Sequence, residues 1–172
     1  PLLLVPTTAG TGSEVTPVAI ITTGATTKAG VSSPVLLPDV AVLDAALTLG
    51  LPPAVTAMTG VDAMVHAIEA YTSRHKKNLL SDNLAVQALQ LLARNIRTAV
   101  REGGNRQARE NMLLGACLAG QAFANAPVAA VHALAYPLGG HYHIAHGLSN
   151  SLVLPSVLEF NAPEASALYA EL

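Results

Sequence analysis

The side chains best suited to hold a metal ion fall in two places along the chain. In the first, Asp62 and His66 lie four residues apart in a segment whose apolar residues repeat at a helical period. This spacing predicts that both side chains lie on one face of a helix, one turn apart. Because that face is otherwise apolar, an unpaired carboxylate on it would be costly. A bound cation and an Asp–His hydrogen bond would each remove the cost, and the pair alone does not decide between them.

The second place is a stretch rich in histidine. Four of the six histidines fall within the fifteen residues from His132 to His146, and no Lys, Arg, Asp or Glu occurs between Glu110 and Glu159. Imidazole is a versatile ligand for divalent transition metals. Pro137 and the two glycines that follow it predict a helix break. We therefore expect His132 on one helix and His146 at the start of the next.

These two places could together enclose one metal ion. A helix that carries the Asp–His pair and a broken helix pair that carries His132 and His146 would supply ligands from facing helices. For the other histidines of the stretch, His141 and His143, we expect hydrogen bonds in the core instead. Ligation rich in imidazole suits Fe, Zn, Ni or Cu, so the spacing does not choose the metal.

The hydrophobic pattern indicates which elements position these side chains. Short apolar runs predict strands in the first fifty residues, at Leu2–Val5, Val18–Thr22 and Val40–Leu43. Helical periodicity then predicts helices at about 57–71, from Ser81 to the glycines at 103 and 104, at about 106–124, from near Pro127, and after His146. We therefore expect residues 1–51 to supply part of a nucleotide-type sheet and residues 52–172 to be a helical domain.

A polar turn follows the first predicted strand. The sequence from Pro6 to Thr16 is PTTAGTGSEVT, rich in glycine and small hydroxyl side chains that can approach a phosphate or a ribose closely. It is neither a Walker loop nor a GxGxxG fingerprint. Alone, the turn predicts only a polar loop after a strand.

The composition sets limits on the class of protein. Hydrophobic residues make up 51% of the 172-residue chain and charged residues 12%, less charge than a free-standing domain of this size needs on its surface. We therefore expect part of a longer polypeptide or an oligomer. No run reaches the roughly 20 clean apolar residues of a membrane-spanning helix, and we expect no membrane. The single cysteine, Cys117, lies in an apolar run and is expected to be a buried small hydrophobe in a cytoplasmic protein.

The charge distribution gives no reason to propose nucleic acid as a partner. The net charge is −2, and eight of the nine Lys and Arg residues fall between Arg74 and Arg109. Because no aromatic residues are interleaved with them for base stacking, we interpret this basic cluster as a solvated helix face with loops.

Four segments in order resemble the iron-containing (group III) alcohol dehydrogenase family. They are PTTAGTGSE at 6–14, SPVLLPDVA at 33–41, GVDAMVHAIEAY at 60–71, and the stretch from His132 to Asn150 with the family's histidine spacing. The resemblance covers essentially the whole chain. It implies an α/β nucleotide-binding domain followed by an all-helical metal-binding domain, an architecture shared with dehydroquinate synthase. It also implies that the family's glycine-rich pyrophosphate loop and the end of the helical domain lie outside this chain, so the chain alone should bind cofactor poorly.

The resemblance also implies roles for individual residues. The metal ligands would be Asp62, His66, His132 and His146, holding Fe²⁺ or, alternatively, Zn²⁺. The residues around NAD or NADP would be Thr7, Thr8, Thr11, Thr16 and Lys28. Many relatives carry a further histidine one turn after His132, where this chain has Tyr136. A phenol can donate a hydrogen bond or relay a proton through water, but its unperturbed pKa is near 10.

The predicted function is a metal-dependent, NAD(P)-linked alcohol dehydrogenase that interconverts a small alcohol and its aldehyde or ketone, as a homo-oligomer. One alternative is a lyase of the dehydroquinate synthase type, or a glycerol dehydrogenase-type relative. Another is an inactive, metal-free relative whose histidines are structural. A measurement of metal content distinguishes the metal-free relative from the two enzymes. A dehydrogenase forms NADH as a net product, whereas the lyase forms it only transiently.

Overall fold

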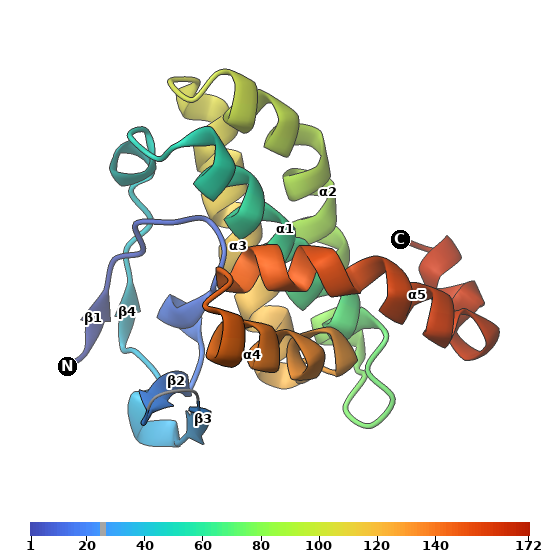
Figure 1. Ribbon diagram of the computed structural model, residues 1–172. Helices are drawn as coiled ribbons and strands as arrows, with labels where there is room; N and C mark the ends of the chain where they lie inside the picture. The colour runs from blue at the N-terminus through green and yellow to red at the C-terminus, as the bar shows by residue number, and fades with distance from the viewer. Residues whose placement is uncertain (25–26) are drawn as a thin grey trace.

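The computed structural model describes residues 1–24 and 27–172, and the chain begins with short strands. Strand β1 (Leu3–Leu4) pairs in parallel with β4 (Val40–Ala41), and β2 (Val18–Thr23) forms an antiparallel hairpin with β3 (Thr27–Ser32). The helices follow: α1 (Pro53–Tyr71), α2 (Leu79–Arg101), α3 (Arg106–Asn125), α4 (Ala130–Tyr142) and α5 (His146–Ala170). In Figure 1 the strands lie to one side of the helices, and α5 projects from the other.

Helices α1, α2 and α3 pack together largely through small side chains. The alanines between them are almost completely buried, including Ala63, Ala67 and Ala70 on α1, Ala85 and Ala88 on α2, and Ala116 and Ala119 on α3. Larger side chains, chiefly Leu92, Met112 and Leu113, fill the remaining space. Asparagine side chains cap two of these helices: Asn78 accepts from the backbone N–H of Ser81, and Asn105 from that of Ala108.

A second, smaller apolar cluster holds α4 and α5 against α1. Val65 of α1, Val131 of α4 and Val157 of α5 are buried together. Val65 lies between Asp62 and His66 in the sequence, and Val131 precedes His132. This cluster therefore sets the positions of the helices that carry the predicted ligands.

The helix break that the sequence predicts at Pro137 lies later in the chain. Helix α4 begins at Ala130, not near Pro127, and continues through Pro137 to Tyr142. Proline removes one helical hydrogen bond, but Ala133 and Pro137 are both exposed. The carbonyl that loses its partner therefore lies on the outer face, where water can bind it. The helix ends instead at His143, whose φ of 55° is left-handed.

The hairpin contains a strand that the sequence analysis did not predict. Strand β3 reads TKAGVS, with Val31 as its only large apolar residue and a glycine inside it. It lacks the apolar alternation by which strands are recognised. The strand forms instead through its pairing with β2, which runs from Val18 opposite Ser32 to Thr23 opposite Thr27.

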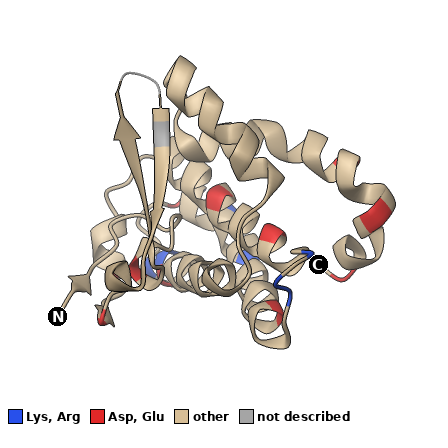
Figure 2. Ribbon diagram, turned by 90° about the horizontal axis from the view of Figure 1, so that it is seen from below, with Lys and Arg blue, Asp and Glu red and all other residues tan. Residues whose placement is uncertain are grey.

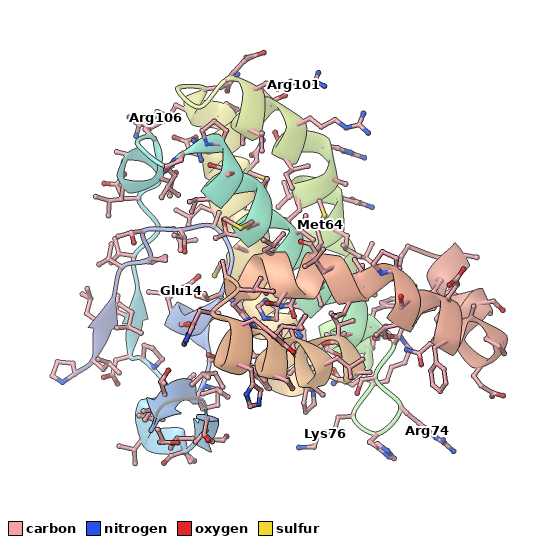
Figure 3. All side chains as sticks on the ribbon, viewed as in Figure 1. Glu14, Met64, Arg74, Lys76, Arg101 and Arg106 are labelled. Carbon is pink, nitrogen blue, oxygen red and sulfur yellow. The ribbon has the colours of Figure 1, made fainter. Side chains whose placement is uncertain are left out.

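The loop before β2 packs tightly against α3. Gly12 has a φ of 61°, and a Cβ on it would lie 2.5 Å from the Cα of Gly120. The next turn buries Glu14 (Figure 3), and this burial raises the pKa of its carboxyl group. Cys117 lies in the same region of α3. Burial, with Glu14 adding to it, raises the pKa of the Cys117 thiol to about 11, so it is protonated at neutral pH, as expected for a buried small hydrophobe.

The basic cluster has one buried member. Arg74 and Lys76 lie in the loop between α1 and α2, Arg101 ends α2 and Arg106 begins α3 (Figure 3), and all four are exposed. Arg109 is 2% exposed. Its guanidinium donates to the carbonyls of Gly103 and Leu51 and to the Thr56 hydroxyl. Arg109 thus joins α3 to the start of α1.

The uncharged stretch corresponds to most of α3, all of α4 and the first half of α5. Helix α4 and the start of α5 carry no charged position in Figure 2. Within the described residues, no single helix has both the length and the apolar composition required to cross a membrane. Helices α3 and α4 meet those criteria only when taken together, and they are bent by 108° relative to each other.

Candidate metal centre

Three of the four predicted ligands converge from three helices. Ligand atoms of Asp62 on α1, His132 on α4 and His146 on α5 all lie within 4.8 Å of one another. The Asp62 Oδ1 atom is 3.8 Å from Nε2 of His132 and 3.5 Å from Nε2 of His146. Asp62 and His132 are buried, whereas the His146 side chain is 38% exposed. The cluster is therefore closed on the side of α1 and α4 and accessible beside α5.

His66 lies next to this cluster. Its ring stacks on His132, with centroids 4.6 Å apart, and on Phe123 of α3, at 4.5 Å. Its Nδ1 atom is buried and has no hydrogen-bond partner within the described part of the chain. Burial lowers the pKa of His66 to about 4, the field of Asp62 opposing this shift. The ring is therefore neutral at pH 7, and its buried Nδ1 atom lies on a residue next to the cluster of Asp62, His132 and His146.

The amide of Asn150 lies at the centre of the converging atoms. Asn150 Nδ2 donates to Asp62 Oδ1 and lies 3.3 Å from Nε2 of both His132 and His146. Its Oδ1 is buried without a partner among the described residues. One carboxylate oxygen and two imidazole nitrogens thus surround a single point, and the ligand atoms of a cation need the same arrangement. The donor set, imidazole nitrogens with one carboxylate, suits a divalent transition metal.

A buried glutamate that the sequence analysis did not single out supports His132. Glu69, 4% exposed, lies on α1, and its Oε2 is 2.6 Å from Nδ1 of His132. Its Oε1 accepts from the backbone N–H of Val131 at 2.7 Å. A signal was present in the sequence: Glu69 follows His66 by three residues and so shares its helix face.

The stability of the chain without metal is expected to depend on pH through His66. Because burial lowers the pKa of His66 from 6.5 to about 4, only the unfolded chain binds this proton between those values. The free energy of unfolding should therefore fall as the pH drops from about 6.5 to about 4, by on the order of 3 kcal/mol. Urea titrations at several pH values, with a chelator present, would measure how the free energy of unfolding depends on pH. This dependence should be steeper in the wild type than in His66→Gln. An equal dependence in both would contradict the lowered pKa of His66.

A cleft of about 800 Å³ connects the candidate metal centre with the β2–β3 hairpin. Two of the predicted cofactor-binding threonines, Thr11 and Thr16, line it together with the four predicted ligands. Thr7 and Thr8 are not among its lining residues, and the side chain of Lys28 lies outside the described residues. The structure thus brings part of the polar turn to the cleft.

Tyr136 also lines the cleft. Its ring stacks on His146, with centroids 5.9 Å apart. Burial, followed by the charges of Glu69 and Asp62, raises the pKa of its hydroxyl above the usual value of 10. The phenol is therefore protonated at neutral pH and can donate a hydrogen bond into the cleft.

The sequence matches a known protein family over most of its length. Residues 56–172 match the Fe-containing alcohol dehydrogenase family, C-terminal, and residues 1–45 match iron-containing alcohol dehydrogenase. The chain belongs to the iron-containing alcohol dehydrogenase family. This confirms the family predicted from the four sequence segments.

Individual members of the family are similar over nearly the whole chain. Long-chain-alcohol dehydrogenase 1 of Geobacillus thermodenitrificans is 53% identical over 160 residues, which is 93% of this chain and 40% of the relative. The crystal structure of an iron-containing alcohol dehydrogenase from Thermotoga maritima has a TM-score of 0.91 and 41% identity, covering 98% of this chain and 45% of that one. Sulfoacetaldehyde reductase from Bifidobacterium kashiwanohense, in complex with NAD⁺, has a TM-score of 0.87 and 37% identity, covering 94% and 43%.

These similarities confirm the predicted fold class. They also show that the chain spans less than half the length of these relatives. The predicted boundary between residues 51 and 52 and the individual ligand and cofactor roles remain predictions.

Proposed function

We propose that the chain supplies the metal centre and part of the cofactor cleft of a metal-dependent, NAD(P)-linked alcohol dehydrogenase. The observation that carries this proposal is the convergence of Asp62, His132 and His146, with the unpartnered His66 nitrogen beside them. These four residues would hold a divalent ion, Fe²⁺ or Zn²⁺. The bound ion would supply Lewis acidity, which favours hydride transfer between the substrate carbon and the nicotinamide.

The other residues of the cleft would orient the reactants. Thr11 and Thr16 would hydrogen-bond the dinucleotide, and Thr7, Thr8 and Lys28 would complete its surroundings in the intact enzyme. Phe123 lies against His66 and would keep water from that side of the ligands. Tyr136, protonated and stacked on His146, would donate a hydrogen bond toward the substrate oxygen or a proton through water.

The relatives support alcohols and aldehydes as the substrate class. Their names include long-chain-alcohol dehydrogenase, 1,3-propanediol dehydrogenase and lactaldehyde reductase. The NAD⁺ bound to the Bifidobacterium reductase supports a nicotinamide cofactor. We also propose a cytoplasmic homo-oligomer, because the chain has a single, unpaired cysteine and exposes large apolar side chains such as Val35, Leu79 and Phe160.

The test is metal binding by the chain followed by turnover in a protein of the relatives' length that contains it. After anaerobic reconstitution with Fe²⁺ or Zn²⁺, mass spectrometry should find about one ion per chain. Small alcohols with NAD⁺ or NADP⁺ should then give net formation of reduced cofactor. Absence of bound metal would overturn the proposal. Transient reduced cofactor without accumulation would favour the lyase alternative.

A further inference from the structure

Glu69 binds two partners at once, and neither is a reactant. Its carboxylate is almost completely buried between α1 and the first turn of α4. One oxygen lies 2.7 Å from the backbone nitrogen of Val131 and the other 2.6 Å from Nδ1 of His132. Both oxygens are therefore committed to fixed positions.

The first of these partners, the Val131 N–H, can only donate a hydrogen bond. It is a backbone donor in the first turn of α4, where no helical carbonyl accepts it. The preceding N-cap residue, Ala129, offers no side-chain acceptor. A buried backbone donor without a partner is costly. Glu69 is thus the cap of α4, and its negative charge lies at the favourable end of the helix dipole.

The second partner can change its role, because a neutral imidazole carries its proton on either nitrogen. An ionised carboxylate only accepts hydrogen bonds, so Oε2 requires the proton of His132 on Nδ1. The Nε2 lone pair then faces the centre of the ligand cluster. The amide nitrogen of Asn150, a donor, lies 3.3 Å from that Nε2, as expected if Nε2 is an acceptor.

We infer that Glu69 is a positioning residue that fixes the tautomer of His132, so that Nε2 is always available to bind the metal. This inference rests on the proposed metal site. Carboxylates that accept from the distal nitrogen of a ligating histidine orient the ring and increase its basicity. The charges of the site are consistent with this role, because the carboxylates of Asp62 and Glu69 together would neutralise one divalent ion.

The substitution Glu69→Gln tests this inference with almost no change of shape. Glutamine has one acceptor oxygen and one amide donor. The Val131 N–H must take the oxygen, so the amide must face Nδ1 of His132. That contact requires Nδ1 to accept and moves the ring proton to Nε2, where it points at the metal position. The variant should therefore show the opposite tautomer and bind metal about 10- to 100-fold more weakly.

The tautomer can be read directly from ¹⁵N-labelled histidine rings in the metal-free chain by NMR. The wild type should carry the His132 proton on Nδ1, and the variant on Nε2. A role confined to capping α4 would not move this signal. Glu159→Gln, an exposed position on α5, is the matched control and should leave tautomer and metal affinity unchanged.

The outcomes separate this inference from the proposed function. A wild-type proton on Nε2, or a variant with Nδ1 protonated and metal affinity unchanged, overturns the inference even when the chain binds metal. If the wild type binds no metal, the proposed function fails, and with it the role of Glu69 toward a metal. If Glu69→Gln does not fold, the wild-type tautomer alone decides.

Discussion

His132→Ala is expected to remove the bound metal ion and to lower the rate of hydride transfer by at least about a thousandfold. His132 is the predicted ligand on α4, and its ring lies between Asp62, His66 and Asn150. A Lewis acid contributes several kcal/mol to stabilising developing charge on oxygen. Each 1.4 kcal/mol corresponds to roughly a factor of ten in rate. Metal content of the chain and turnover in a protein of the relatives' length are the two measurements.

His132→Ala also leaves Glu69 buried without its imidazole partner, which is destabilising in itself. His146→Ala is therefore needed beside it. The His146 side chain is 38% exposed, so its removal should lose the metal at a smaller cost in stability.

The matched control is His141→Ala. His141 lies on α4, as His132 does, but is exposed at the far end of the helix; His143 is exposed too, so the prediction that both lie in the core was wrong. This variant should keep about one ion per chain and most of the activity. If His132→Ala folds and retains the full complement of metal, the ion is bound elsewhere and the proposed site is wrong.

The convergence of the ligands could be anticipated because it depends mostly on local spacing. Asp62 and His66 share a helix face for geometric reasons alone. His132 and His146 needed only a helix end somewhere between them. The predicted position of that end, Pro137, was wrong, yet the end at His143 has the same consequence. The predicted convergence requires only that a helix ends between His132 and His146, so an error in the exact residue does not affect it.

The supporting residues could not be anticipated because their partners come from other elements. The helix face that Glu69 shares with His66 was visible in the sequence. That its oxygens meet Val131 and His132 depends on how α4 packs on α1. Asn150 follows His146 by one turn, but its place among three ligand atoms depends on α1 as well. Strand β3 likewise is ordered by its pairing with β2.

Gly147→Ala is expected to weaken both the fold and the metal site, although it adds one methyl group. A Cβ at residue 147 would lie 2.3 Å from the backbone oxygen of Met58 and 2.7 Å from its carbonyl carbon. These atoms belong to the backbone of α1 and cannot rotate away. The start of α5 and α1 would have to separate by roughly 1 Å, and overpacking of this kind costs about 1–3 kcal/mol.

The separation would act on the site directly, because the first two turns of α5, which carry His146 and Asn150, would move away from Asp62 on α1. Metal sites require their ligands to be held within about 0.5 Å, so the affinity for Zn²⁺ should fall at least about tenfold. Gly50→Ala is the control, since a Cβ there meets nothing within 4 Å. It should change neither the urea midpoint nor the affinity. A Gly147→Ala variant with wild-type stability and affinity would show that α1 and α5 do not hold the close contact on which the geometry of the site depends.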